Sequence, residues 1–266
     1  MRSEFETRRE IVEIGRRLWD RGYVAANDGN ISARLGGRIL VTPTGLSKGF
    51  LKPDDIVVVS ESGVKLSGRI DPTSELPMHL AVYRERTDID AVVHAHPPKA
   101  TGFAVAGVPL AQCVLPEVIL TLGEVPLAGY ATPSTEEVAR SICEFIPRFN
   151  AILLSNHGAL TLGRDLSQAY FRMETVEHFA EITLAARALG GPSPLSSDDV
   201  RKLLNVREKL GLGETVADCS DCGACEGTTA RPEAADGVTV EPDEEEVVRV
   251  VLARLGEVLD EKGDRR

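Results

Sequence analysis

Three of the five histidines stand where they could bind one metal ion. His94 and His96 form a His-x-His pair after an apolar run, and His157 follows a second apolar run and precedes Gly158. Side chains two residues apart on an extended strand point to the same side. With His157 from a second element, the pair would supply the three protein ligands of a catalytic zinc site that keeps one position open. The alternative is that all three are ordinary polar residues at strand ends; the glycine turn at the third histidine favours a metal.

The other two histidines are predicted to be structural. His79 lies four residues after Glu75 on an expected helix, and His178 follows Glu174 and Glu177 on another. Glu75 itself stands at a helix start, where a carboxylate has two interpretations. It could be a surface residue stabilised by the helix dipole, or it could face the metal as a general acid and base. The residues alone leave both interpretations open.

Three short segments of small polar residues could hold a phosphate. They combine hydroxyl groups, an amide and glycine at turns and at a helix start, where backbone N–H groups and hydroxyls can surround an oxyanion. Each segment taken singly is an ordinary turn. The candidate residues are Asn30, Thr44, Gly45, Thr73 and Ser74.

The elements expected around these residues alternate between strands and helices. Helical spacing of apolar residues predicts helices over 4–22, from 72 through 82 and over 166–189. The second helix would begin at Pro72-Thr73-Ser74-Glu75, with Thr73 or Ser74 as its N-cap. Short apolar runs predict strands at 31–34, 39–41, 56–59, 90–93 and 151–154. Such short strands interleaved with helices indicate a layered α/β domain.

Six segments together resemble one known family. The chain is similar to the class II aldolase/adducin family, and within it to the L-fuculose-1-phosphate aldolases, over about residues 4–190. The segments occur in the family's order and at nearly its spacing, so the set is far more specific than any single motif. They are Gly29-Asn30-Ile31-Ser32, Thr42-Pro43-Thr44-Gly45, Pro72-Thr73-Ser74-Glu75, Val92-Val93-His94-Ala95-His96, Tyr130-Ala131-Thr132 and Asn156-His157-Gly158.

The resemblance implies a fold, a reaction and a role for each matching residue. The fold would be a layered α/β/α domain with a central mixed, largely antiparallel sheet. The reaction would be zinc-dependent retro-aldol cleavage of L-fuculose 1-phosphate or L-rhamnulose 1-phosphate to dihydroxyacetone phosphate and L-lactaldehyde. Zn2+ would stabilise the enediolate left when the C3–C4 bond breaks, and Glu75 would protonate the resulting carbon. The zinc ligands would be His94, His96 and His157, and the phosphate would bind Asn30, Thr44, Gly45, Thr73 and Ser74.

A second catalytic residue is expected where the chain departs from part of the family. Fuculose-phosphate aldolases have a tyrosine, contributed across a subunit boundary, near the segment that here reads Cys113-Val114-Leu115-Pro116-Glu117-Val118. Rhamnulose-phosphate aldolases similarly have a glutamate in this neighbourhood, so Glu117 is the candidate for accepting the C4 hydroxyl proton. The family's C-terminal tyrosine is also missing, because Tyr170 is the last tyrosine. Family members form four-fold tetramers, which implies a homotetramer here.

Other functions within the family stay open. Relatives include methylthioribulose-phosphate aldolases and dehydratases, pentulose-phosphate 4-epimerases and sugar-acid decarboxylases. Glu75 favours an aldolase, because the epimerases resemble this motif with aspartate instead. A non-enzymatic interaction protein, like the adducin branch, is disfavoured because that branch lacks the three histidines.

The composition argues against several classes of protein. A net charge of -11 disfavours a nucleic-acid binder, which needs a basic face. No apolar run approaches the roughly 20 residues of a membrane-spanning helix, and the charged first residues lack a secretory signal, so a cytoplasmic protein is expected.

The five cysteines are expected to be reduced thiols. Three of them form Cys219-x-x-Cys222-x-x-Cys225, which could instead bind a metal with a fourth ligand from a partner.

The end of the chain is expected to be an appendage. The aldolase-like domain would span 1–213, followed by a cysteine-containing linker over 214–243 and an amphipathic helix within 244–266. That helix carries Val247, Val251 and Leu255 on one apolar face. It could dock on its own domain or bind a partner. It resembles the encapsulation peptides that tether enzymes to shell proteins of bacterial microcompartments.

Overall fold

The computed structural model describes residues 3–212. The predicted linker, the cysteine cluster at 219–225 and the predicted helix within 244–266 therefore lie outside the described residues. The first helix, α1 (Glu4–Asp20), begins with a capping box: Ser3 accepts a hydrogen bond from the N–H of Glu6, and the Glu6 carboxylate accepts one from the N–H of Ser3. Its apolar stripe of Ile11, Ile14 and Leu18 is buried, as the helical spacing predicts.

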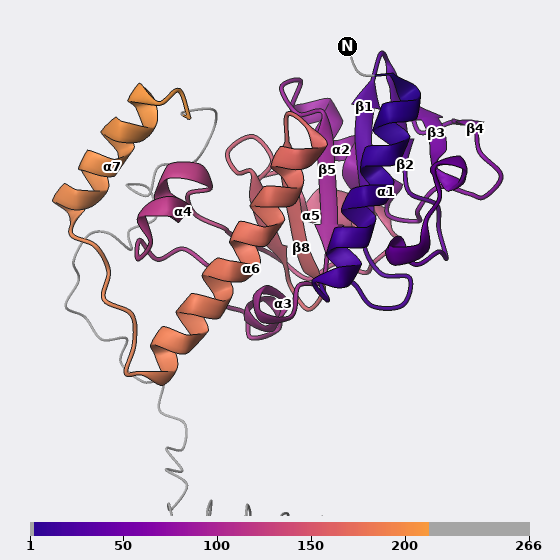
Figure 1. The fold of residues 1–266 in the computed structure, drawn as a ribbon. Coiled ribbons are helices and arrows are strands. Elements are labelled where there is room, and N and C mark those ends of the chain that lie inside the picture. The colour runs from indigo at the N-terminus through magenta and orange to yellow at the C-terminus, as the bar shows by residue number, and fades with distance from the viewer. Residues whose placement is uncertain (1–2, 213–266) are drawn as a thin grey trace, which may run out of the picture. The chain divides into compact units, whose positions relative to one another are not determined.

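An eight-stranded sheet runs through the domain (Figure 1) in the order β4-β3-β2-β1-β5-β8-β7-β6. Only β6 and β7 are parallel; the other neighbouring pairs are antiparallel. The predicted strands are confirmed to within two residues at each end. The strands are β1 (Asn30–Leu35), β2 (Arg38–Val41), β3 (Val57–Ser60), β4 (Lys65–Ser67), β5 (Ala91–Ala95), β6 (Leu127–Ala128), β7 (Ala151–Leu154) and β8 (Gly158–Gly163).

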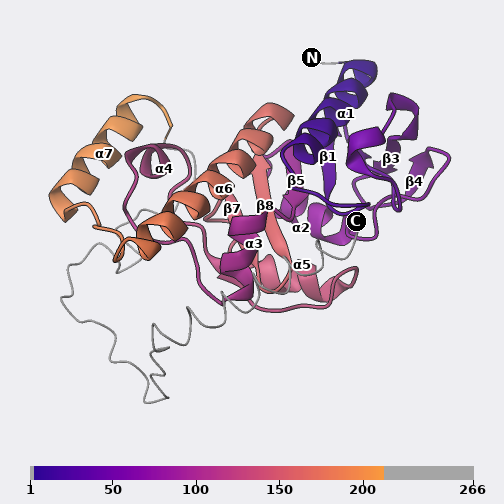
Figure 2. The same ribbon diagram turned by 60° about the horizontal axis from the view of Figure 1, so that its bottom comes forward.

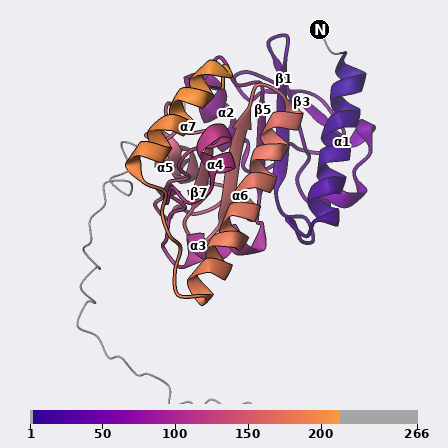
Figure 3. The same ribbon diagram turned by 60° about the vertical axis from the view of Figure 1, so that its left-hand side comes forward.

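Helices cover both faces of the sheet, as Figures 2 and 3 show. On one face, α1, α3 (Pro98–Val105) and α6 (Leu166–Ala188) pack in a core that includes Ile31 and Val93 of the strands. On the other face, α2 (Leu76–Glu85) and α5 (Glu136–Ile142) pack against alternate strand residues such as Val92 and Leu160. The two cores follow from the period of two along each strand. This arrangement confirms the predicted α/β/α fold with a mixed, largely antiparallel sheet.

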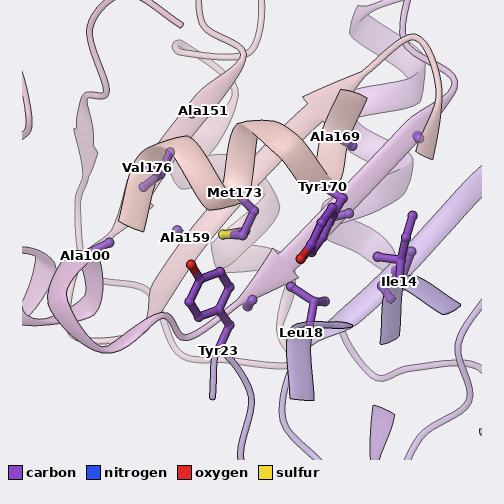
Figure 4. Close-up of a cluster of buried hydrophobic side chains, with 14 of the residues drawn as sticks. Ile14, Leu18, Tyr23, Ala100, Ala151, Ala159, Ala169, Tyr170, Met173 and Val176 are labelled. Atoms are coloured by element: carbon purple, nitrogen blue, oxygen red, sulfur yellow. The ribbon is translucent and has the colours of Figure 1, made fainter. Parts of the chain in front are cut away.

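The contact between α6 and the sheet shows how one core is built (Figure 4). Met173 and Val176 of α6 are fully buried in the same cluster as Ala151 and Ala159 of the sheet. Small strand residues leave room for the longer helix side chains. Burying a Met or Val side chain completely contributes about 1.5–3 kcal/mol, so this face holds the long helix against β7 and β8. The predicted helix over 166–189 is confirmed, one residue shorter.

The predicted start of α2 is wrong. The helix begins at Leu76, and neither Thr73 nor Ser74 caps it. The preceding segment pairs with the chain just after β2 instead, because the N–H of Thr73 donates to the carbonyl of Thr42 at 3.1 Å. Glu75 occupies the N-cap position without capping the helix through its side chain. Its carboxylate is therefore available for another role.

The sequence did not predict α3, α5, α4 (Pro116–Thr121) or α7 (Ser197–Lys209). Of these, α4 and α7 pack together around Ile119 and Val200. Cys113 belongs to the same cluster and is disulfide-bonded. The expectation of reduced thiols is wrong for this residue, whereas Cys143 is free. Cysteine spacing along the chain does not report which sulfur atoms meet in the fold.

Two 3-10 turns, η1 (Lys48–Phe50) and η2 (Pro53–Asp55), connect β2 to β3. Among the helices of residues 3–212, none has the length and apolar character of a membrane span.

Candidate active site

The three histidines come from two strand ends at one edge of the sheet. His94 lies in β5, His96 follows the end of that strand, and His157 lies in the turn between β7 and β8. Strands β5 and β7 are both antiparallel to β8. They therefore run in the same direction and end at the same edge, which brings His157 to His94 and His96.

The turn that carries His157 has a backbone that few residues could adopt. Asn156 has φ of +56°, a left-handed conformation that asparagine tolerates better than most residues. A Cβ atom on Gly158 would lie 2.5 Å from the carbonyl oxygen of Ala95 and 2.6 Å from Cδ2 of His96. Only glycine allows β8 to begin this close to the histidine that it faces. Asn156 and Gly158 thus each have a structural reason in the turn that carries His157.

The three rings converge at distances that suit a shared ion. Their centroids are 4.7–5.0 Å apart, and one ligand atom from each lies within 4.8 Å of the others. The Nε2 atoms of His94 and His96 are 3.1 Å apart, near the about 3.3 Å that separates two ligands of a tetrahedral zinc at normal Zn–N distances. His94 donates from Nδ1 to the carbonyl of Ala159 at 3.0 Å. Its Nε2 therefore carries the lone pair that a metal requires.

Burial favours the neutral form of two of these rings. It lowers the pKa of His94 well below the usual value, and the neighbouring His96 and His157 lower it further. Burial also lowers the pKa of His157. Two neutral rings with converging lone pairs fit a cation better than they fit one another, so the residues present suit a bound metal ion.

The carboxylate of Glu75 contacts two of the histidines, one with each oxygen. Its Oε2 is 3.3 Å from Nε2 of His94, and its Oε1 is 3.3 Å from Nε2 of His157. Oε2 also accepts a hydrogen bond from Nδ2 of Asn30 at 2.7 Å. Oε1 is buried and has no hydrogen-bond partner among the described residues. A buried carboxylate oxygen left in this state usually faces a ligand or carries out chemistry.

A cavity of about 310 Å³ opens beside Glu75, His96 and His157. The structure brings all five predicted phosphate-binding residues to its lining: Asn30, Thr44, Gly45, Thr73 and Ser74. The backbone N–H groups of Thr44 and Thr73 donate to carbonyl groups of the chain, so the donors they can offer an anion are their hydroxyls. Ser74 Oγ lies 2.7 Å from Ser134 Oγ, which extends this group of hydroxyls.

The sequence reasoning missed Lys48, which is the only lysine or arginine among the described residues that line the cavity. Its side chain is 2% exposed, and Nζ donates to the carbonyls of Asn27 at 2.7 Å and Leu46 at 2.6 Å. Burial lowers the pKa of Lys48 to about 8, while the negative charges of Asp28 and Glu75 raise it. The sequence did contain one signal for this residue, because Lys48 closely follows the predicted phosphate-binding residues Thr44 and Gly45.

The other candidate, Glu117, and the two histidines predicted to be structural lie outside the lining of this cavity. Glu117 is exposed on α4 and does not line the cavity of its own chain. His178 is exposed on α6. His79 is fully buried and makes hydrogen bonds with Ser32 and Asn30.

The comparisons with known proteins agree with this geometry. The class II aldolase and adducin N-terminal domain matches residues 9–184. An L-fuculose phosphate aldolase of Methanococcus maripaludis is 39% identical over 65% of this chain and 93% of the relative. A 5-deoxy-D-ribulose 1-phosphate aldolase of Bacillus thuringiensis is 33% identical over 77% and 96%, respectively. A 3-oxo-tetronate 4-phosphate decarboxylase of Pectobacterium atrosepticum is 32% identical over 76% and 94%.

Solved structures give the same result. An L-fuculose 1-phosphate aldolase superposes with a TM-score of 0.72 at 31% identity, covering 77% of this chain and 96% of the other. The l-fuculose-1-phosphate aldolase of Thermus thermophilus superposes with a TM-score of 0.63 at 32% identity, covering 73% and 100%. These matches bear out the predicted enzyme class, a class II aldolase. Sequence, fold and site together show that the chain belongs to the class II aldolase and adducin family.

Proposed function

We propose that the protein cleaves a ketose 1-phosphate between C3 and C4 to dihydroxyacetone phosphate and a short aldehyde. The observation that carries the proposal is the Glu75 carboxylate, 3.3 Å from two of three converging histidines at the side of a polar cavity. Retro-aldol cleavage needs positive charge for the enediolate and a nearby proton carrier. This arrangement offers both.

The metal would be held by His94, His96 and His157. A donor set of imidazole nitrogens with one open position suits Zn2+. When bound, the ion supplies the positive charge that stabilises the enediolate.

Proton movements fall to two carboxylates. The C4 hydroxyl loses its proton to Glu117 of a neighbouring subunit, and the electron pair of the C3–C4 bond moves toward the C2 carbonyl as the aldehyde leaves. Glu75, carrying a proton that it has taken from solvent, then delivers it to C3, and Glu117 returns its proton to solvent. Oε2 is hydrogen-bonded to Asn30, whereas Oε1 has no hydrogen-bond partner among the described residues. Oε1 is therefore the atom placed to carry that proton.

The phosphate would bind at the hydroxyl groups of Thr44, Thr73 and Ser74, with Gly45 and Asn30 beside them. These groups are neutral, so Lys48 supplies the positive charge that a phosphate dianion needs. The two carbonyls on Lys48 Nζ leave one of its three N–H groups for the anion.

The aldehyde portion depends on the sugar. L-fuculose 1-phosphate and L-rhamnulose 1-phosphate would release L-lactaldehyde, whereas 5-deoxy-D-ribulose 1-phosphate would release acetaldehyde. A second candidate function, decarboxylation of a 3-oxo acid phosphate, is favoured by the relative that is named for that reaction. Both reactions place a carbanion next to a carbonyl, so the same site chemistry serves either.

A substrate panel tests the proposal. Purified protein is incubated with each ketose 1-phosphate and with 3-oxo-tetronate 4-phosphate, and dihydroxyacetone phosphate and CO2 are measured separately. We expect dihydroxyacetone phosphate from at least one ketose, loss of activity on chelation and recovery with Zn2+. Activity that is indifferent to a chelator would contradict the aldolase proposal. So would activity confined to 3-oxo-tetronate 4-phosphate, whose decarboxylation gives dihydroxyacetone phosphate together with CO2.

A further inference from the structure

A line of polar side chains lies between α2 and β1 and leads away from the cavity, which two of its members, Glu75 and Asn30, line. Glu75, His79 and Tyr83 stand four residues apart along α2, and Asn30 and Ser32 stand two residues apart on β1. Four helical residues rise about 6 Å, and two strand residues rise about 6.6 Å. The two repeats nearly match, so side chains from the helix and the strand can alternate along one line.

Hydrogen bonds connect all five residues. Tyr83 Oη lies 2.7 Å from Ser32 Oγ, which lies 2.7 Å from Nδ1 of His79. Nε2 of His79 is hydrogen-bonded to Oδ1 of Asn30. Nδ2 of Asn30 donates to Oε2 of Glu75 at 2.7 Å. The line therefore ends on the carboxylate of the active site.

The carboxylate determines the direction of every bond in this line. Oε2 of Glu75 accepts whether the group is a carboxylate or carries a proton on Oε1, so the NH2 group of Asn30 faces it and Oδ1 faces His79. His79 must then donate from Nε2 and accept at Nδ1 from the hydroxyl of Ser32. Ser32 in turn accepts from the phenol of Tyr83, which closes the line with a donor.

Burial maintains the protonation states that this direction requires. It lowers the pKa of His79 to about 4, despite the opposing charge of Glu75, so the ring carries one proton at neutral pH. It raises the pKa of Tyr83, so the phenol keeps its proton and can donate. Asn30, Ser32, His79 and Tyr83 are all buried and hydrogen-bonded along the line, which makes the line costly to rearrange.

The consequence appears at the two oxygens of Glu75. An Asn30 amide rotated by half a turn would place Oδ1 against Oε2, with two acceptors facing each other. The N–H of His79 opposes that rotation by holding Oδ1. Oε2 thus stays hydrogen-bonded to Asn30, and Oε1 stays beside His157 without a hydrogen bond.

We infer that His79 is a positioning residue for the reaction: it fixes the amide of Asn30 so that Glu75 presents Oε1 to the substrate. This inference rests on the proposed function for the identity of the acid and base. It goes beyond the structural role predicted for His79, because a purely structural histidine would affect stability and leave the turnover of folded protein unchanged.

Kinetics of three variants test the inference. His79→Leu removes both hydrogen bonds of the ring, and we expect kcat to fall about 10- to 100-fold, the range for partners of functional groups, with metal content unchanged and KM changed far less. His79→Gln keeps an N–H donor for Asn30 and should recover much of the lost kcat. Val82→Ala is the control: Val82 is fully buried on α2 in the apolar cluster, so this variant should lose thermal stability and keep kcat. Unchanged kcat in His79→Leu, or an equal loss of kcat in Val82→Ala, would overturn the inference.

The tautomer of His79 tests it without any substrate. In 15N NMR of histidine-labelled wild-type protein, Nε2 of His79 should have the shift of a protonated nitrogen and Nδ1 that of an acceptor. A proton on Nδ1 would overturn the inference, because the ring could not then donate to Asn30. The expected tautomer in a protein that cleaves none of the ketose phosphates would support the positioning of Glu75 and contradict only the proposed reaction.

Discussion

At the residue scale, the chemistry depends on one carboxylate whose two oxygens have different surroundings. Oε2 of Glu75 accepts a hydrogen bond from Asn30, while Oε1 has none and faces His157. A general acid needs one oxygen that can gain and release a proton without breaking a strong bond. The arrangement separates the oxygen that anchors the side chain from the oxygen that is proposed to react.

Replacing Glu75 with glutamine tests this role. Glu75→Gln should keep its metal and bind phosphate, because the amide has nearly the same shape, yet lose roughly 100-fold or more in kcat. It should also slow the exchange of the C3 proton of dihydroxyacetone phosphate with solvent, measured by NMR. Unchanged exchange in a variant with normal metal content would assign proton transfer to another residue.

Lys48 predicts a pH dependence of substrate binding. Burial lowers the pKa of Lys48 to about 8, so its positive charge is present below that pH and is lost as the pH rises through it. We expect KM for the phosphate substrate to rise above about pH 8, measured by steady-state kinetics. Lys48→Met should raise KM about 10-fold or more at pH 7, the cost of a lost hydrogen bond to a charged group, and should flatten this rise. Lys52→Met, at an exposed lysine nearby, is the matched control and should change neither.

At the element scale, the site depends on where strands end and how closely they approach. β5 and β7 end together because both are antiparallel to β8. α2 adds Glu75 and His79 from the face of the sheet on which Asn30 and Ser32 lie. The three candidate metal ligands thus come from strand ends, and the proposed acid and base comes from a helix start.

Gly158 tests the close approach of β7–β8 to β5. A Cβ atom there would lie 2.6 Å from Cδ2 of His96, so Gly158→Ala should cost about 1–3 kcal/mol of stability as overpacking does and weaken metal binding. Thermal unfolding and metal titration measure the two effects. Gly102→Ala in α3 meets no atom within 4 Å and is the control, which should be neutral or stabilising. Normal metal affinity in Gly158→Ala would show that His96 does not need this contact.

At the scale of the whole molecule, one proposed catalytic residue is absent from the cavity of its own chain. Glu117 is exposed on α4, so its proposed role requires a neighbouring subunit. We expect a homo-oligomer, a tetramer by analogy with the family, in light scattering.

Mixing two inactive variants tests whether the site is shared. Glu75→Gln and Glu117→Gln should each be nearly inactive alone. Unfolded and refolded together, they should regain activity at about a quarter of the sites if each site joins two chains at random. An active monomer, or mixtures without recovery, would contradict a shared site.

The segment beyond residue 212 is proposed to determine location rather than catalysis. Deleting residues 242–266 should leave kcat and KM unchanged, because the described site is complete without them apart from Glu117 of a neighbour. If the apolar face of the predicted helix binds a shell protein, the same segment fused to a reporter should recruit the reporter to that protein. Docking on its own domain predicts the opposite: lower thermal stability after deletion and no recruitment. A loss of turnover on truncation would contradict both and assign the segment to the active site.

The sequence by itself predicted five of the eight strands and three of the seven α-helices of residues 3–212, and it supplied most of the candidate site residues, because those properties are local. Strand periodicity, the His-x-His pair and the turn at Gly158 depend on neighbours along the chain, and six motifs in order identified the family. Tertiary packing decided the rest. The hydrogen bond between Thr73 and Thr42 places the start of α2 later than predicted. The fold places the buried Lys48 in the lining of the cavity. The packing of α2 on β1 connects His79 to Glu75 through Asn30. These outcomes depend on which segments pack against each other in the fold. The residues that meet there are far apart along the chain, so no local sequence pattern predicts their contacts.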